Sequence, residues 1–261
     1  MNVLLLLALA TGALCVAFAL CYLLARRIDN YGIVDIAWSY AFGVVGLFYA
    51  LAAAGATPRR ILLGTMVGAW SARLGTHLYR RVMSHHPTED TRYRQLREDW
   101  AADFPRKMFG FFQVQALSVV FLAIPFLVSL RNPAPGLHPL EYTGAALWLL
   151  GLGGEALADA QLAAFKRDPA NKGRVCDRGL WSYSRHPNYF FEWLTWVAYW
   201  LFACASPWGW ATVTSPALML YFLVRVTGIP ATEQQSLRNK GEAYRAYQRT
   251  TSAFVPWFKK R

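Results

Sequence analysis

Apolar residues occur along this chain in long blocks, without the regular polar positions of a helix that lies half in water. A helix needs about 20 predominantly apolar residues to cross the hydrocarbon core of a bilayer. Seven blocks approach or exceed this length, at residues 3–24, 33–54, 61–79, 109–130, 140–165, 189–205 and 208–227. The pattern predicts an all-α polytopic membrane protein with seven transmembrane helices, formed by a single domain over residues 1–261.

The composition agrees with a membrane protein. Hydrophobic residues make up 55% of the 261 residues and charged residues 16%, whereas soluble domains carry about 25% charged residues. Ordinary soluble enzymes are therefore disfavoured. The first block is followed by Arg26 and Arg27 and not by a cleavage site, so we expect it to be a retained helix. The four cysteines lack metal-ligand or redox spacing, so they are expected to pack in the interior, and no metal site is predicted.

The net charge of +12 raises the question of a nucleic-acid partner, and the positions of the charges answer it. If the N-terminus lies outside, the inside segments hold 22 of the 27 Lys and Arg residues, and the outside segments hold only Arg59, Arg60 and Arg131. This asymmetry follows the positive-inside rule. It predicts an outside N-terminus, a cytoplasmic C-terminus and no nucleic-acid binding, in a bacterial inner membrane or an ER-like membrane.

Several ionisable residues lie inside the predicted spans, where each is costly and is by default a sign of function. They are Asp35, Arg73, His77, Glu155, Asp159, Glu192 and Arg225. A spacing of four residues places Arg73 with His77, Glu155 with Asp159, and Asn188 with Glu192 on shared helical faces. We expect one cavity near the inside ends of the spans to collect these groups. The alternative is a set of buried ion pairs, such as Asp35 with Arg73, that only hold helices together.

The most informative stretch is residues 159–192. Its inside loop contains six cations, Lys166, Arg167, Lys172, Arg174, Arg178 and Arg185. Arg binds phosphate through a planar fork and Lys as a point charge, so the loop suits a polyphosphate ligand. The alternative is positive-inside charge without a ligand.

A short R-H-P-N-Y run, Arg185 to Tyr189, opens the sixth predicted helix. Pro187 suits a first helical turn. Asn188, Tyr189 and Glu192 then present polar groups towards the expected cavity, where an amide and a carboxylate would hold an amide-bearing ring.

These segments resemble the steroid 5-alpha-reductase family, in its bacterial branch of membrane proteins. The similarity is best over residues 155–193 and 244–257, and the first half adds Asp35, Trp38 and Arg73. The resemblance implies a seven-helix fold and an NADPH-dependent oxidoreductase that reduces the 4,5 carbon-carbon double bond of a 3-oxo-Δ4 steroid or a similar enone lipid. Residues 140–261 would carry the NADPH-binding signature on the cytoplasmic side, with no obligate protein partner.

The resemblance also implies roles for individual residues. Six positions match nucleotide-contacting positions of the family, and three neighbours are assigned to the same site: Asp159, Lys166, Arg174, Asn188, Tyr189 and Glu192, with Asn171, Arg185 and His186. The catalytic acid on the second helix would be Asp35. Trp70 or a neighbour stands where the family has a catalytic Tyr, so Tyr40, His77 and Tyr79 are candidate substitutes. Trp38, Trp70 and Arg73 are expected to contact substrate.

The expected mechanism follows the flow of charge. Hydride adds to the β-carbon of the enone, negative charge develops on the ketone oxygen, and a donor must stabilise that oxygen. A protonated Asp35 is expected to be this donor, and return of a proton to the α-carbon completes the reduction.

Two other classes of function remain open. A membrane methyltransferase that uses S-adenosylmethionine, of the isoprenylcysteine carboxyl methyltransferase type, resembles this chain in its R-H-P-x-Y segment and basic tail. That family carries paired acids early in the tail, where this chain has Glu233 and Gln234. A non-enzymatic lipid-binding or transport protein would use the inward charges as a pathway, but it does not explain why cations gather beside Asn188 and Glu192.

Overall fold

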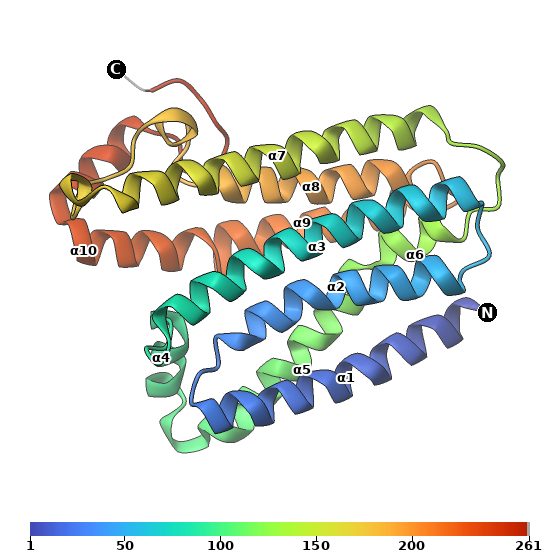
Figure 1. Ribbon diagram of the computed structural model, residues 1–261, viewed down its shortest axis with the longest axis horizontal. Helices are drawn as coiled ribbons and strands as arrows, with labels where there is room; N and C mark the ends of the chain where they lie inside the picture. The colour runs from blue at the N-terminus through green and yellow to red at the C-terminus, as the bar shows by residue number, and fades with distance from the viewer. Residues whose placement is uncertain (260–261) are drawn as a thin grey trace. The chain divides into compact units, whose positions relative to one another are not determined.

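The computed structural model describes residues 1–259, and the chain divides into two compact units (Figure 1). Unit 1 is Met1–His138 with Ser206–Gly209, and unit 2 is Pro139–Ala205 with the chain from Trp210 onward. Helices make up most of both units, and the described residues contain no β-strand beyond an isolated bridge between Ser184 and Ser252. The all-α prediction is confirmed. The single-domain interpretation stays a prediction.

Unit 1 consists of α1 Val3–Ile28, α2 Ile33–Ala52, α3 Thr57–His85, α4 Thr91–Asp99, the 3₁₀ turn η1 Ala101–Asp103, α5 Phe104–Leu122 and α6 Ile124–Leu130. The Asn2 side chain caps α1 by accepting from the Leu5 backbone N–H at 2.8 Å, as N-cap residues do. The fourth apolar block breaks into α5 and α6 at Ala123, because Pro125 lies in the first turn of α6 and cannot continue the preceding helix.

Helices α2 and α3 pack along one another because small residues on α2 face α3. A Cβ at Gly46 would lie 2.6 Å from Val67 Cγ1, and one at Gly43 would lie 2.6 Å from Ser71 Oγ. Such close backbone approach is typical of membrane helix pairs. Ser71 Oγ also accepts from the Gly43 backbone N–H at 3.0 Å and donates to the Ser39 carbonyl at 2.7 Å. The first half of the chain thus has a tightly joined helix pair.

Unit 2 consists of α7 Pro139–Arg167, the 3₁₀ turns η2 Pro169–Asn171 and η3 Gly179–Ser182, α8 Pro187–Ala203, the 3₁₀ segment η4 Gly209–Val213, α9 Thr214–Tyr221, the π-helical segment η5 Phe222–Val226 and α10 Ile229–Thr250. Gly241 interrupts α10 with a φ of 51° and a ψ of −124°, a conformation that residues with a Cβ rarely adopt. The last turns of α10 therefore take a new direction (Figure 1).

Helices α7 and α8 form the second tightly packed pair. A Cβ at Gly151 would lie 2.5 Å from Thr195 Oγ1, and one at Gly144 would lie 3.0 Å from the Ala198 carbonyl oxygen. The glycines of α7 thus let α8 approach closely. This packing fixes the end of α7 relative to the start of α8, where the candidate cofactor residues lie.

Among the described residues, four helical stretches are long and apolar enough to cross a membrane: Val3–Ile28, Ile33–Ala52, Ala101–Leu130 and Gly209–Thr250. An integral membrane protein is consistent with this finding. Each predicted block falls on helix, but ionisable residues lower the hydropathy of α3 and α7, and α8 has only 17 residues. The count of seven spans, the orientation of the termini and the side of the cofactor site stay predictions.

Candidate functional site

Arg185 anchors the R-H-P-N-Y segment to α10 within unit 2. Its Nε donates to Glu233 Oε1 at 2.6 Å, and its Nη1 donates to the carbonyl oxygens of Gln248 and Thr251 at 3.1 and 2.6 Å. The Arg185 and Glu233 side chains are only 11% and 17% exposed. Gln248 Nε2 donates to the second Glu233 oxygen at 3.0 Å. The largely buried Arg185–Glu233 pair and its neighbouring hydrogen bonds thus connect the start of α8 to the parts of α10 before and after Gly241.

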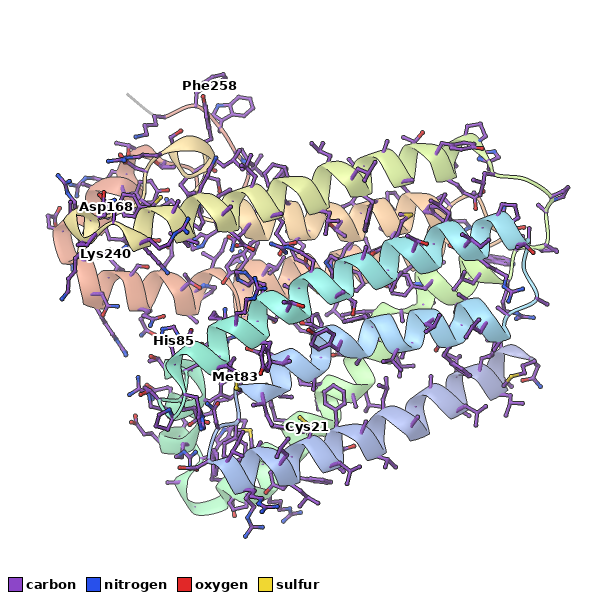
Figure 2. The ribbon with its side chains drawn as sticks, viewed as in Figure 1. Cys21, Met83, His85, Asp168, Lys240 and Phe258 are labelled. Atoms are coloured by element: carbon purple, nitrogen blue, oxygen red, sulfur yellow. The ribbon has the colours of Figure 1, made fainter. Side chains whose placement is uncertain are left out.

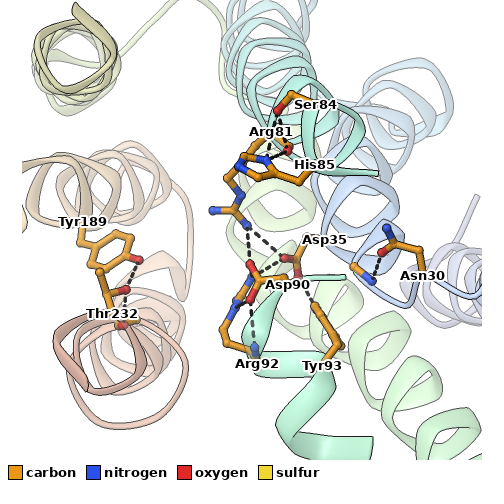
Figure 3. A network of polar contacts seen from close by, with 12 residues as sticks. Asn30, Asp35, Arg81, Ser84, His85, Asp90, Arg92, Tyr93, Tyr189 and Thr232 are labelled. Atoms are coloured by element: carbon orange, nitrogen blue, oxygen red, sulfur yellow. Dashed lines mark hydrogen bonds and ion pairs between the residues drawn. The ribbon is translucent and has the colours of Figure 1, made fainter. Parts of the chain in front are cut away.

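His186 extends this contact network. Its Nε2 lies 3.4 Å from Glu233 Oε1, and its ring stacks on Tyr189 with 5.4 Å between the ring centroids. Tyr189 Oη in turn lies 3.0 Å from Thr232 Oγ1 (Figure 3). Burial lowers the pKa of His186, and the hydrogen bond and charge of Glu233 oppose this shift only in part. The neutral ring is therefore the favoured form.

The lowered pKa of His186 predicts that acid destabilises unit 2. Above pH 6.5, the ordinary histidine value, both the folded and the unfolded imidazole are neutral. As the pH falls below 6.5, the unfolded chain takes up this proton first, so stability is lost on acidification. We expect the melting temperature of the detergent-solubilised protein to fall over this range, and His186→Gln to flatten that slope.

The titration of Asp90 falls in a lower pH range than that of His186, so the two contributions to acid destabilisation can be told apart. Burial raises the pKa of Asp90, but the charge and hydrogen bonds of Arg92 together with the charge of Arg81 outweigh burial and keep this pKa below its ordinary 3.8, so the contribution of Asp90 is lost only at lower pH. A slope that is the same with and without His186 would show that this ring does not set the pH dependence.

Asp159 of α7 and Asn188 of α8 meet across the tightly packed helix pair. Asn188 Nδ2 donates to Asp159 Oδ1 at 3.3 Å. Asn188 Oδ1 is buried and has no hydrogen-bond partner among the described residues. A buried acceptor without a donor is costly, and a ligand N–H would satisfy it. Glu192, one turn further along α8, accepts from Trp196 Nε1 at 2.9 Å.

A basic hollow of about 570 Å³ opens between the α7–α8 connection and the last turns of α10. Its lining includes Asn171, Arg174, Asp177, Arg178, Tyr247 and Lys259. Three cations against one carboxylate make it electropositive, although Lys259 Nζ lies 3.4 Å from Asp177. Tyr247 Oη donates to the carbonyl oxygens of Trp181 and Ser184. Tyr247, which lines the hollow, therefore also holds the chain that leads into the R-H-P-N-Y segment.

The predicted cofactor residues all lie in unit 2, but they form several separate groups of contacts. Asp159 meets Asn188, and Arg185 and His186 share Glu233. Asn171 and Arg174 line the basic hollow, whereas Lys166 is exposed and lies near Lys240.

Sequence reasoning missed several residues of this site. Glu233, Thr232, Gln248, Tyr247 and Lys259 complete the contacts or line the hollow. A signal for Glu233 was present, because an acid in the tail is a natural partner for the cations of the R-H-P-N-Y segment.

In unit 1, Asp35 is the centre of a separate polar cluster (Figure 3). Its Oδ2 accepts from Arg92 at 2.8 Å and from Arg81 at 3.4 Å, and its Oδ1 accepts from the Tyr93 hydroxyl at 2.7 Å. All three contacts use Asp35 as an acceptor, because two guanidinium groups and a phenol donate to it. The catalytic role of Asp35 as a donor stays a prediction, and in these contacts Asp35 is an acceptor.

The other predicted residues of unit 1 lie along α2 and α3. Tyr40 Oη is 3.0 Å from Thr76 Oγ1, and Trp38 Nε1 donates to Ser118 Oγ at 2.9 Å. Trp70 is fully buried with its ring against Phe42. Arg73 is half-buried and His77 exposed. Tyr40 and His77 are therefore exposed and Trp70 is a core residue, and the roles of all three stay predictions.

Comparison with known proteins places the chain in a family. Residues 21–251 match the family described as "Protein of unknown function (DUF1295)". The chain is also similar to "Uncharacterized protein C594.04c" of Schizosaccharomyces pombe, with 27% identity over 258 residues that cover 85% of this chain and 72% of that protein. No solved structure matches. Because the match covers most of its length, the chain belongs to the DUF1295 family.

Proposed function

We propose that this protein is a membrane reductase that uses NADPH to reduce the 4,5 double bond of a 3-oxo-Δ4 steroid or a similar enone lipid. The basic hollow of unit 2 is the observation that carries the proposal. Its volume of about 570 Å³ lies within the usual range for small-molecule sites, about 300 to 1,000 Å³. Arg174, Arg178 and Lys259 line it and are the residue types that bind phosphate.

The positive charge of the basic hollow favours NADPH over S-adenosylmethionine. NADPH carries a pyrophosphate and a further phosphate, whereas S-adenosylmethionine has no phosphate and carries a positive sulfonium. A hollow with three cations and one carboxylate attracts the first ligand and repels the positive centre of the second. For this reason the methyltransferase is the weaker proposal, although both families share the R-H-P-x-Y run.

The partnerless oxygen of Asn188 supports the same ligand. A nicotinamide ring carries a carboxamide whose N–H groups match a buried acceptor that has no donor. Asp159 holds the Asn188 side chain from the other end. In this proposal Asn188 orients the ring, and the Arg185–Glu233 pair keeps the start of α8 in place.

Bound NADPH would supply a hydride to the β-carbon of the enone. The negative charge on the ketone oxygen then requires a donor. Asp35, Tyr40 and His77 stay the candidates for this donor, and of these Asp35 accepts from Arg81, Arg92 and Tyr93.

Removing a phosphate-binding cation from the hollow should weaken NADPH binding without unfolding the protein. A hydrogen bond to a charged group contributes about 1.5 to 3 kcal/mol, so Arg174→Ala or Arg178→Ala should raise Kd roughly 10- to 100-fold. Lys172→Ala is the matched control, since Lys172 belongs to the same loop and is exposed but does not line the hollow. Binding is measured by calorimetry on detergent-solubilised protein, and unchanged affinity in both arginine variants would remove the hollow from the proposed site.

A further inference from the structure

Aromatic and apolar side chains gather on the outside of unit 2 where the C-terminal segment crosses the α7–α8 connection. Tyr183, Val255, Trp257 and Phe258 are 44%, 51%, 68% and 74% exposed. We call these four residues the tail aromatic cluster. Figure 2 shows Phe258 at the outer edge of this segment. Soluble surfaces rarely leave neighbouring large aromatic residues uncovered, and such a patch marks an interaction site.

The tail aromatic cluster is held in place. The Trp257 backbone N–H donates to the Tyr183 carbonyl at 2.9 Å, and Ser184 Oγ donates to the Phe254 carbonyl at 2.8 Å. The Tyr183 and Phe258 rings meet edge to face, with centroids 6.1 Å apart and an interplanar angle of 77°. The exposed rings are therefore presented by a fixed backbone and are not a frayed end.

Positive charge adjoins these rings. Lys259 follows Phe258 directly, and the next residues in the sequence are Lys260 and Arg261, which lie outside the described residues. Asp177, at 3.4 Å from Lys259, is the one acid paired with this stretch in the described chain. Aromatic residues followed by a short cationic run match a membrane surface that carries anionic lipids, where Trp and Tyr sit at headgroup level and Lys and Arg meet the phosphates.

The position of the cluster in unit 2 also suits a membrane surface. Tyr183 lies four residues before α8 begins at Pro187, so the cluster lies at the end of the α7–α8 pair. The predicted spans of α7 and α8 would place residues at this end of the pair within reach of the headgroups. We propose that the tail aromatic cluster inserts into the headgroup region of an anionic bilayer and docks the C-terminal segment on the membrane.

A photocrosslinking amino acid tests this docking in the full-length protein. The benzophenone analogue of phenylalanine replaces Phe258 and, as the control, Glu242, an exposed residue of α10 that pairs with Arg245 and Arg249. Both variants are reconstituted into nanodiscs of phosphatidylcholine alone or mixed with phosphatidylglycerol. Adducts formed on irradiation are identified by mass spectrometry.

We expect lipid adducts at position 258, several-fold more abundant in the anionic nanodiscs, and few at position 242. Lipid adducts at 258 that do not depend on lipid charge would overturn the assignment to an anionic surface. Adducts of position 258 to a second copy of the chain, or no adduct in either membrane, would overturn the docking itself. Phe258 is largely exposed, so an aromatic replacement there leaves packing intact.

Discussion

Replacing Glu233 by alanine is expected to destabilise the protein more than any other single change at the candidate site. The substitution leaves Arg185 without its 2.6 Å partner and removes the acceptor of Gln248 and of His186. Loss of one partner from a buried ion pair costs about 3 to 5 kcal/mol. The melting temperature in detergent should fall on the order of 10 °C, measured by scanning fluorimetry.

Two variants control this experiment. Glu242→Ala removes an acid of the same helix whose partners, Arg245 and Arg249, are exposed, and exposed pairs contribute little, so no measurable change is expected. The double variant Arg185→Met with Glu233→Leu removes both charges, and it should recover much of the stability that Glu233→Ala loses. If Glu233→Ala melts as the wild type does, the pair does not hold α8 to α10.

Replacing Asp35 by alanine is the second change with a large expected effect. It leaves the buried Tyr93 hydroxyl without its acceptor and Arg92 without its closest partner. These losses should cost about 2 to 4 kcal/mol and release α4 from the start of α2. Hydrogen exchange or limited proteolysis of residues 86–103 should then increase, alongside a lower melting temperature.

Asp35→Asn distinguishes support from catalysis. The amide keeps an acceptor for Tyr93, so a supporting role predicts a partial recovery of both stability and turnover on a steroid enone. An amide can donate a hydrogen bond but cannot give up a proton, so normal folding with lost turnover would favour a role of Asp35 as proton donor. Asp103→Ala is the matched control, because that acid pairs with Lys107 on an exposed surface.

Hydropathy predicted the helices of this chain well because long apolar blocks can satisfy their backbone groups in a membrane only as helices. It missed α4 in the predicted inside loop, since the charged residues of Thr91–Asp99 show no apolar block. That helix is held by tertiary contacts, among them Tyr93 with Asp35 and Arg97 with Asp29. Contacts between residues so far apart in sequence leave no periodic signal.

Residues of the candidate site could be predicted from the sequence where their spacing along one helix or loop points to a shared chemistry. Asn188 and Asp159 were named from the sequence, and they meet because glycines bring α7 and α8 together. The basic loop was named as a phosphate site, but its hollow is completed by Tyr247 and Lys259 from the C-terminal region. The partners of Asp35, Arg92 and Tyr93, lie more than 50 residues away in the sequence. Spacing within one helix cannot reveal such partners.

The central claim, that unit 2 binds a phosphate-bearing nicotinamide nucleotide, is tested most directly by ligand-dependent melting of the wild-type protein in detergent. A ligand of the native state at about 100 times its Kd stabilises it by about 2.7 kcal/mol. We expect a clear rise in melting temperature with NADPH, a smaller rise with NADH, which lacks the additional phosphate, and none with S-adenosylmethionine. A rise with S-adenosylmethionine and none with NADPH would contradict this claim.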